Sequence, residues 1–188
     1  FCGFSQDAKL ADIGCGLGAT VRHIRRNYGY DICGIEKDKD AVKLAVTQFV
    51  YAGDSTELPF DSDELNGLLF ECSLSKMDNP ELVFTECQRV LRPGGYLIIS
   101  DMYARGSSAT LSGLLGRIET KEELMNKLIM NGFNIKLFED YSDELHRMWG
   151  QLIFEHGTKA LCENLGTDSE KIKKIKCGYC LIIAQKGA

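Results

Sequence analysis

A group of glycines near the start of the chain is spaced for ligand binding. Gly14, Gly16 and Gly18 follow a short apolar run that contains Asp12. Glycine has no Cβ, so the backbone can turn sharply there and a ligand can lie against it. The helix expected after the turn directs its first backbone N–H groups at the same place. The pattern therefore predicts a turn that binds a flat, polar, nucleoside-like molecule.

Acidic residues at the ends of three predicted strands extend this pattern. Asp12 lies two positions before the first glycine, Glu36 follows the turn by roughly twenty residues, and Asp54 follows the third predicted strand. A carboxylate at the position of Glu36 can accept hydrogen bonds from both hydroxyls of a ribose. A carboxylate at the position of Asp12 would face a cation. Together the acids predict a ligand crevice at one edge of an open α/β sheet.

Two alternatives remain open at this point. Gly14, Gly16 and Ala19 also satisfy the glycine pattern of dinucleotide-binding domains, and Glu36 fits that interpretation too. An NAD(P)-dependent oxidoreductase is therefore the first alternative. The second is a non-catalytic module that binds a cofactor or a partner, because no general base can be assigned from the sequence.

Apolar strand-like runs alternate with helical patterns, which predicts a mostly parallel sheet covered on both faces. The predicted strands are Lys9–Ile13, Asp31–Ile35, Phe49–Ala52, Leu65–Phe70, Gly95–Ser100, Asn134–Phe138 and Tyr179–Gln185. The predicted helices are Ala19–Asn27, Lys39–Phe49, Pro80–Leu91 and Thr120–Asn131. The segment Arg92–Gly95 is expected to end a helix and to begin the next strand.

Several motifs in one order resemble those of small-molecule class I S-adenosylmethionine-dependent methyltransferases. They are Asp12-x-Gly14-x-Gly16-x-Gly18, Ala52-Gly-Asp-Ser55 and the run Arg89–Asp101 with its Arg-Pro-Gly-Gly turn. The resemblance covers most of the chain. It implies an α/β fold with a doubly wound, seven-stranded, mostly parallel sheet, Rossmann-like, whose last strand is antiparallel. It also implies S-adenosylmethionine as cofactor and in-line methyl transfer to a small molecule. Phe70–Ser75 further resembles a group of mostly anaerobe bacterial methyltransferases of unassigned substrate.

The resemblance also assigns roles to individual residues. The glycine turn and Asp12 would seat the methionine end of the cofactor, Glu36 its ribose and Asp54 its adenine. The expected cofactor-binding residues are Asp12, Gly14, Cys15, Gly16, Gly18, Glu36, Lys37, Asp54, Ser55 and Glu71.

The segment after the fourth predicted strand passes the transferred methyl group in the resembled family. It lacks the Asn/Asp-Pro-Pro-Tyr motif of DNA amino-group methyltransferases, and the net charge of −5 also argues against a nucleic-acid partner. The catalytic candidates are Glu71, Cys72, Tyr103 and His146. A thiol at Cys72 leaves an arsenite methyltransferase-like activity as a minor alternative, which would need a second thiol such as Cys162.

Residues 139–176 separate the sixth and seventh predicted strands and form a helical insert. The spacing of apolar residues predicts a helix over Tyr141–Glu155, and a second one follows around Thr158–Leu165. We expect this insert either to pack as core or to roof the acceptor pocket. The Gly- and Ser-rich segment Met102–Gly116 is expected to form either a mobile lid or a surface loop.

Bulk properties set the remaining limits. The chain has 188 residues, of which 44% are hydrophobic, and we expect a single domain over residues 1–188. It starts at Phe1, close to the first predicted strand, so we expect a native N-terminal helix to be missing. The sequence leaves the oligomeric state open.

The cysteines and the apolar runs predict a cytoplasmic protein. The eight cysteines are irregularly spaced, as in reduced cytosolic proteins. Cys177 and Cys180 have the spacing of half a metal site but lie in a predicted strand, where such positions face opposite sides, so no metal is expected. No apolar run approaches the ~20 residues that span a bilayer, and no signal peptide is visible.

Overall fold

The computed structural model describes residues 1–112 and 115–187, and its main feature is a seven-stranded sheet in the order β3-β2-β1-β4-β5-β9-β8. The strands are β1 (Lys9–Ile13), β2 (Asp31–Glu36), β3 (Val50–Ala52), β4 (Leu65–Glu71), β5 (Leu91–Ala104), β8 (Phe133–Asp140) and β9 (Cys177–Lys186). Strands β3, β2, β1, β4 and β5 pair in parallel, whereas β9 runs antiparallel to both β5 and β8. The predicted doubly wound α/β sheet with an antiparallel last strand is confirmed.

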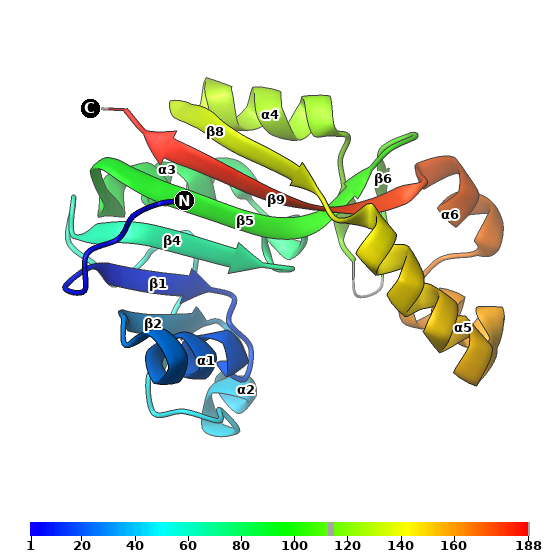
Figure 1. Ribbon diagram of the computed structural model, residues 1–188, viewed down its shortest axis with the longest axis horizontal. Helices are drawn as coiled ribbons and strands as arrows, with labels where there is room; N and C mark the ends of the chain where they lie inside the picture. Colours follow the sequence, from blue (N-terminus) through cyan, green and yellow to red (C-terminus); the bar gives the residue numbers. More distant parts are fainter. Residues whose placement is uncertain (113–114, 188) are drawn as a thin grey trace.

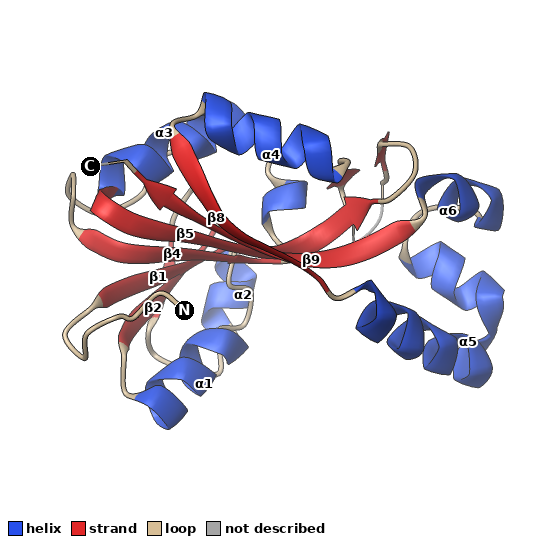
Figure 2. Cartoon of the chain, turned by 45° about the horizontal axis from the view of Figure 1, so that its top comes forward, coloured by secondary structure: helices blue, strands red, loops and turns tan. Residues whose placement is uncertain are grey.

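Helices cover both faces of this sheet. They are α1 (Ala19–Tyr28), α2 (Lys39–Lys43), α3 (Pro80–Val90) and α4 (Lys121–Met130), and Figure 2 shows α1 on the face opposite α3 and α4. Successive side chains of a strand point to opposite faces. In β1, Leu10 accordingly packs with Val21 of α1, while Ala11 belongs to the cluster that contains Phe84 of α3 and Phe133.

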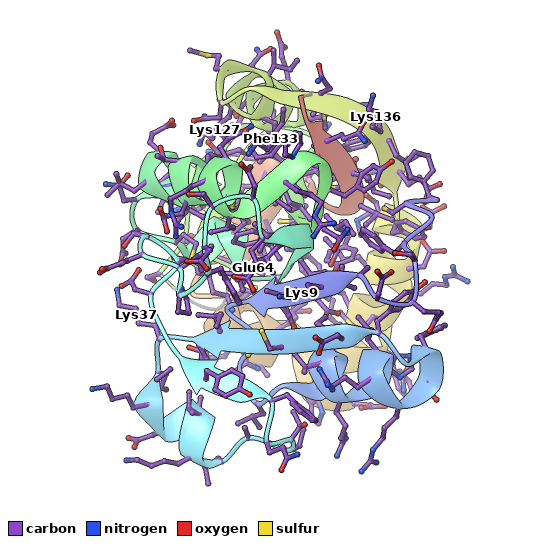
Figure 3. The ribbon with its side chains drawn as sticks, turned by 90° about the vertical axis from the view of Figure 1, so that its left-hand side faces the viewer. Lys9, Lys37, Glu64, Lys127, Phe133 and Lys136 are labelled. Atoms are coloured by element: carbon purple, nitrogen blue, oxygen red, sulfur yellow. The ribbon has the colours of Figure 1, made fainter. Side chains whose placement is uncertain are left out.

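Side chains alternate between the two faces along β8, where Figure 3 labels Phe133 and Lys136. Phe133 is directed into the core, where its ring centroid lies 6.3 Å from that of Phe84, whereas Lys136 is exposed. Lys9 and Glu64 form an ion pair of 3.0 Å at the amino end of β1. The opposite, carboxyl edge of the sheet carries the glycine turn.

Two predicted elements have the wrong bounds. The helix expected over Lys39–Phe49 ends at Lys43, because α2 buries none of its residues and the Val46 N–H instead donates to the Leu17 carbonyl at 2.8 Å. A helix without a buried face has little to stabilise it. The chain turns back toward the glycine turn as a result.

The strand expected over Gly95–Ser100 is much longer, since β5 runs from Leu91 to Ala104. The segment Arg92–Gly95 lies inside β5 rather than ending the preceding helix, which stops at Val90. The residues of this segment have no partners on β4, because the register shifts there: Leu65 pairs with Leu91, and Gly67 pairs with Tyr96. At the other end β5 continues because β9 pairs with it as far as Ala104.

The extended ends of β5 and β9 form a ribbon that carries the insert (Figure 1). The insert contains α5 (Ser142–Asn164) and α6 (Ser169–Ile175), beside a hairpin of β6 (Ala109–Thr110) and β7 (Arg117–Ile118). It begins after Asp140, because β8 extends into the range predicted for it. Gly157, with φ of 83°, interrupts α5 where the sequence predicts two helices to meet. These elements enclose a hydrophobic cluster of their own, which includes Met102, Ile118 and Trp149.

The segment predicted as a lid or surface loop, Met102–Gly116, lies beside the insert. Residues 113 and 114 are outside the described residues, and Leu111 is buried in the cluster of the insert. Within residues 1–112 and 115–187, no helix combines the length and the apolar character needed to span a membrane.

Candidate functional site

The glycine turn joins β1 to α1 and uses its three glycines differently. Gly14, Gly16 and Gly18 have φ of 72°, 54° and 75°, in the left-handed region that favours glycine. A Cβ on Gly18 would lie 2.4 Å from the Val50 side chain, so this glycine permits close packing on β3. A Cβ on Gly16 would meet no atom within 4 Å. The bare backbone at Gly16 therefore faces open space that a ligand can fill.

That space is part of a cavity of about 370 Å³ at the carboxyl ends of β1, β2 and β4. We call it the nucleoside cavity, because it lies at the turn where the sequence predicts a nucleoside-like ligand and its volume is in the range of small-molecule sites. It is lined by Ile13, Gly14, Gly16, Ile35, Glu36, Lys37, Gly53, Asp54, Ser55, Thr56, Cys72, Ser73, Lys76, Met77, Asp78 and Asn79.

Glu36 ends β2 with its carboxylate in the wall of this cavity. Its Oε2 accepts a hydrogen bond from the Gly16 N–H at 2.8 Å, and its Oε1 accepts one from the Asp38 N–H at 2.9 Å. Each oxygen keeps a lone pair for a further donor, because a carboxylate offers about four acceptor positions. The backbone bonds thus fix a carboxylate that can still accept from two hydroxyls.

Asp54 lies beyond β3 and remains ionised. Its Oδ1 accepts from the backbone N–H and the hydroxyl of Thr56 at 3.0 and 2.8 Å, and its Oδ2 pairs with the Lys37 ammonium at 3.2 Å. The hydrogen bonds from Thr56, followed by the contact with Lys37, hold the pKa of Asp54 below its ordinary value. This carboxylate can accept from an exocyclic amino group.

Asp12 is a buried carboxyl that pairs with no cation among the described residues. The residue is 2% exposed, and its Oδ1 has no hydrogen-bond partner among the described residues. Burial, followed by repulsion from Glu71 and Glu36, raises the pKa of Asp12 to about 7. A buried polar atom without a partner is costly, and a cation next to three carboxylates would offset that cost. The site is therefore prepared for a positively charged group of a ligand.

A second cavity, of about 480 Å³, lies between the β5–β9 ribbon and α5. Cys72 belongs to the walls of both cavities. It has φ of 51°, which is uncommon for a residue with a Cβ, and its Sγ lies 3.5 Å from the Tyr179 hydroxyl. The two cavities therefore adjoin at a backbone position that is held in an unfavourable conformation.

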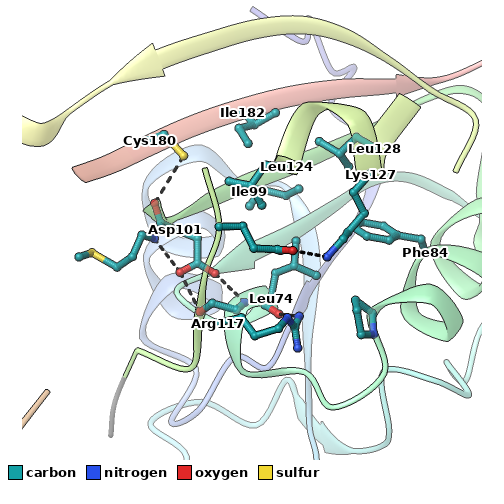
Figure 4. A pocket seen from close by; sticks show the side chains of 14 residues that line it. Leu74, Phe84, Ile99, Asp101, Arg117, Leu124, Lys127, Leu128, Cys180 and Ile182 are labelled. Carbon is teal, nitrogen blue, oxygen red and sulfur yellow. Dashed lines mark hydrogen bonds and ion pairs between the residues drawn. The ribbon is translucent and has the colours of Figure 1, made fainter. Parts of the chain in front are cut away.

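The segment after β4, residues 72–79, separates the cavities and is fixed from both sides. Ser75 donates from its N–H and its hydroxyl to the Asp101 carboxylate, at 2.9 and 3.0 Å. Arg117 of β7 donates to the carbonyls of Met77 and Leu74, at 2.5 and 3.4 Å. Figure 4 shows Asp101 and Arg117 at a third cavity, whose 20 Å³ leave no room for a cofactor.

Comparisons with known proteins agree with this geometry. A family model described as a methyltransferase domain matches residues 11–99. The O-methyltransferase resE of Aspergillus sclerotiorum is 27% identical and the match covers 97% of this chain and 77% of that protein. These matches support a class I S-adenosylmethionine-dependent methyltransferase. S-Adenosylmethionine is its cofactor.

Solved structures of similar fold extend the comparison. The geranyl diphosphate C-methyltransferase of Streptomyces coelicolor A3(2) has a TM-score of 0.80 at 16% identity, and the match covers 97% of this chain and 74% of that one. The cyclase SpnF has a TM-score of 0.76 at 23% identity, with 98% and 76% covered. At such identities the likeness shows the fold alone, and one fold serves several reactions.

The predicted cofactor-binding residues of the methyltransferase divide into two groups. Those that line the nucleoside cavity are Gly14, Gly16, Glu36, Lys37, Asp54 and Ser55, and those that do not are Asp12, Cys15, Gly18 and Glu71. Asp12 and Glu71 belong to one acidic group, in which Glu71 also accepts from the Thr20 hydroxyl. The Cys15 thiol lies where a Cβ on Gly34 would be, so it packs against β2.

The catalytic candidates of the methyltransferase are not brought together. Only Cys72 lines the second cavity. The Tyr103 hydroxyl donates to Asp140 at 3.0 Å, and His146 is exposed with its Nε2 3.0 Å from the Cys177 carbonyl. Cys162 is buried in α5 and lines neither cavity, so the second thiol of the arsenite hypothesis does not join Cys72.

Sequence reasoning missed several residues of the methyltransferase site. Tyr179 faces Cys72 from β9, and Lys76, Met77 and Asn79 line the nucleoside cavity. The signal for the last three is their place directly after β4, at the carboxyl edge where ligands bind in such sheets. No comparable signal identifies Tyr179, because its position depends on the pairing of β9 with β5.

Proposed function

We propose that the methyltransferase transfers the methyl group of S-adenosylmethionine to a small-molecule acceptor by in-line displacement. The observation that carries the proposal is the shared wall at Cys72, which places a second cavity directly beside the nucleoside cavity. Two adjoining cavities can hold two reactants close and aligned. Such alignment lowers the barrier of a bimolecular reaction by several kcal/mol.

The chain's own residues would hold the cofactor in three places. Glu36 accepts from the ribose hydroxyls, and Asp54 accepts from the adenine amino group while the Ser55 N–H meets the ring. The carboxylates of Asp12 and Glu71 attract the ammonium of the methionine end. When bound, the cofactor supplies a methyl carbon that already carries a sulfonium leaving group.

Neither polar group at the shared wall acts as a resting base. Desolvation raises the pKa of the Cys72 thiol and of the Tyr179 hydroxyl above their ordinary values, so both hold their protons at neutral pH. They form a hydrogen bond with each other, so the pair has one proton left to donate toward the second cavity. A general base is not required when the acceptor atom is itself a good nucleophile.

Titration calorimetry with S-adenosylhomocysteine tests the proposal. We expect micromolar binding to the wild type, at least about tenfold weaker binding to Glu36→Gln, and unchanged binding to Asp31→Asn. Asp31 is a matched control because it lies on the same strand and pairs with Arg25 outside the cavity. Absence of binding to the folded wild type would reject the proposal, and tight binding of NAD(P) in its place would favour an oxidoreductase.

Binding alone does not establish transfer, because the cyclase SpnF shares the fold. The second measurement follows labelled methyl groups from S-adenosylmethionine into a panel of small acceptors. Labelled product supports the proposal. Cofactor binding without product across the panel would point to the non-catalytic alternative.

A further inference from the structure

The second cavity, which we call the apolar cavity, has a lining that restricts its ligand. We propose that it binds an uncharged, largely apolar acceptor that directs one polar atom at Cys72 and Tyr179. The inference rests on the proposed methyl transfer and adds the substrate class. It concerns the described residues that line the cavity: Cys72, Ser75, Asp101, Met102, Leu115, Leu145, Met148, Trp149, Leu152, Leu161, Asn164, Leu165 and Tyr179.

Size and composition are the first argument. The cavity measures about 480 Å³, inside the ~300–1,000 Å³ of small-molecule sites. Most of its described lining is aliphatic, aromatic or thioether. Burying apolar surface is favourable at roughly 25 cal/mol for each Å², so such a wall selects a ligand with an apolar body.

Charge is the second argument. Among the described lining residues there is no lysine, arginine or histidine. The one carboxylate, Asp101, is 5% exposed and already accepts hydrogen bonds from Ser75 and the Met102 N–H. An anionic group in this cavity would lose its water without gaining a counter-ion. Carboxylates and phosphates are therefore excluded.

The described residues also offer no preformed metal site that would attract an anion. In the part of the chain that the structure describes, no group of three His, Cys, Asp or Glu residues can hold an ion. The geranyl diphosphate methyltransferase of similar fold was solved with Mg²⁺ and its diphosphate.

Hydrogen bonding is the third argument, and it places the polar atom of the acceptor. Among the described polar groups of the lining, the Cys72 thiol and the Tyr179 hydroxyl form a hydrogen bond of 3.5 Å, and because both are protonated the pair keeps one proton to donate. Cys72 is also in the wall of the nucleoside cavity. An acceptor oxygen, nitrogen or sulfur that receives this hydrogen bond thus lies at the junction of the two cavities.

Helix α5 of the insert covers one side of the apolar cavity. Leu145, Met148, Trp149 and Leu152 lie three or four positions apart on α5 and share one face of the helix. Trp149 and Leu145 are buried in the cluster of the insert, whereas Met148 is 52% exposed. The stripe predicted as either core or pocket lining therefore serves both purposes.

Trp149 provides the assay, because it is the only tryptophan of the chain and lines the cavity. The probes are a nitrobiphenyl methanol and the nitrobiphenyl carboxylate of the same ring skeleton, both of which quench indole fluorescence. We expect saturable quenching by the uncharged methanol and at least about tenfold weaker binding of the carboxylate. Equal affinities, a preference for the carboxylate, or no saturable quenching would overturn the inference.

Variants on α5 sharpen the test. Met148→Arg adds a cation at an exposed lining position and should strengthen carboxylate binding about tenfold. Phe154→Arg adds the same charge to the same helix, 91% exposed and away from the cavity, and should change neither affinity. Equal effects of both variants would indicate general charge attraction and would overturn the inference.

Calorimetry with S-adenosylhomocysteine on the same samples separates the two proposals. If S-adenosylhomocysteine binds normally and the nitrobiphenyl methanol does not bind, the inference about the acceptor is overturned and the proposed function stays intact. If the nitrobiphenyl methanol binds and S-adenosylhomocysteine does not, the proposed function is rejected, while the ligand class of the apolar cavity stands.

Discussion

Replacing Asp12 with Asn tests the electrostatics of the site, because Asn has the same shape and no charge. In the free protein the pKa of Asp12 is raised from 3.8 to about 7, mainly by burial. This rise corresponds to roughly 4 kcal/mol, at about 1.4 kcal/mol for each tenfold change in proton affinity. The ionised side chain destabilises the free protein by that order of magnitude.

The pH dependence of stability follows from this rise. The folded protein holds the Asp12 proton more tightly than the unfolded chain, so stability falls as the pH rises from about 4 to about 7. Below pH 4 both states are protonated and the contribution vanishes. We expect Asp12→Asn to be more stable than the wild type at pH 8 by a few kcal/mol, and the difference to disappear at pH 4. Urea unfolding at the two pH values measures it.

Cofactor binding should depend on pH in the opposite sense. With a pKa of about 7, about ten elevenths of Asp12 is ionised at pH 8 and about one eleventh at pH 6. A ligand ammonium binds the ionised form, so S-adenosylhomocysteine should bind about tenfold more weakly at pH 6. In Asp12→Asn the affinity should be low at both pH values.

Calorimetry at pH 6 and pH 8 on both proteins decides the matter. Proton release on binding near pH 7, detected with buffers of different ionisation enthalpy, is a second signature of the same titration. The reasoning is refuted if the wild-type affinity does not change with pH, or if Asp12→Asn keeps the same tenfold dependence. In that event the ammonium does not lie beside Asp12.

Three further predictions concern residues around the site. Arg117→Met removes the donors that hold the segment after β4, so we expect a loss of about 1–3 kcal/mol in thermal unfolding together with weaker S-adenosylhomocysteine binding. Gly14→Ala would bring a Cβ within 2.7 Å of a serine Cβ and should cost several kcal/mol of stability. Gly16→Ala meets open space, so it should cost only the ~1–2 kcal/mol of a left-handed alanine and chiefly abolish cofactor binding; paired melting and binding curves measure both variants. Phe133→Ala should lower stability by about 3–5 kcal/mol in urea unfolding and leave the cofactor affinity of the folded fraction unchanged, because Phe133 lies in the core beneath α4 and away from both cavities.

The nucleoside side of the molecule could be predicted because its signals are local. Each acid there lies at the end of a strand, and the carboxyl ends of parallel strands meet at one edge of a sheet. Glu36 and Asp54 consequently face the predicted cavity. The interactions within the acidic group could not be foreseen, since the pKa of Asp12 depends on its burial and on Glu71, which comes from β4.

The acceptor side could be predicted only in outline. The length of β5 depends on its pairing with β9 from Tyr96 to Ala104, a contact between distant parts of the chain. Helix α2 is short because it has no buried face, although its sequence favours a longer helix. The apolar stripe of α5 was visible, but whether it faced core or cavity depended on where the ribbon placed it.

The separate hydrophobic cluster of the insert has a consequence for how the molecule opens. Met102, Trp149 and Ile175 belong to that cluster, whereas the strands beneath the glycine turn share a different one. Separate cores allow separate cooperative units in native-state hydrogen exchange. Amides of α5 and α6 should therefore exchange through openings that leave β1 and β4 protected. Such an opening would let the proposed acceptor enter, and its product leave, while the nucleoside half stays folded.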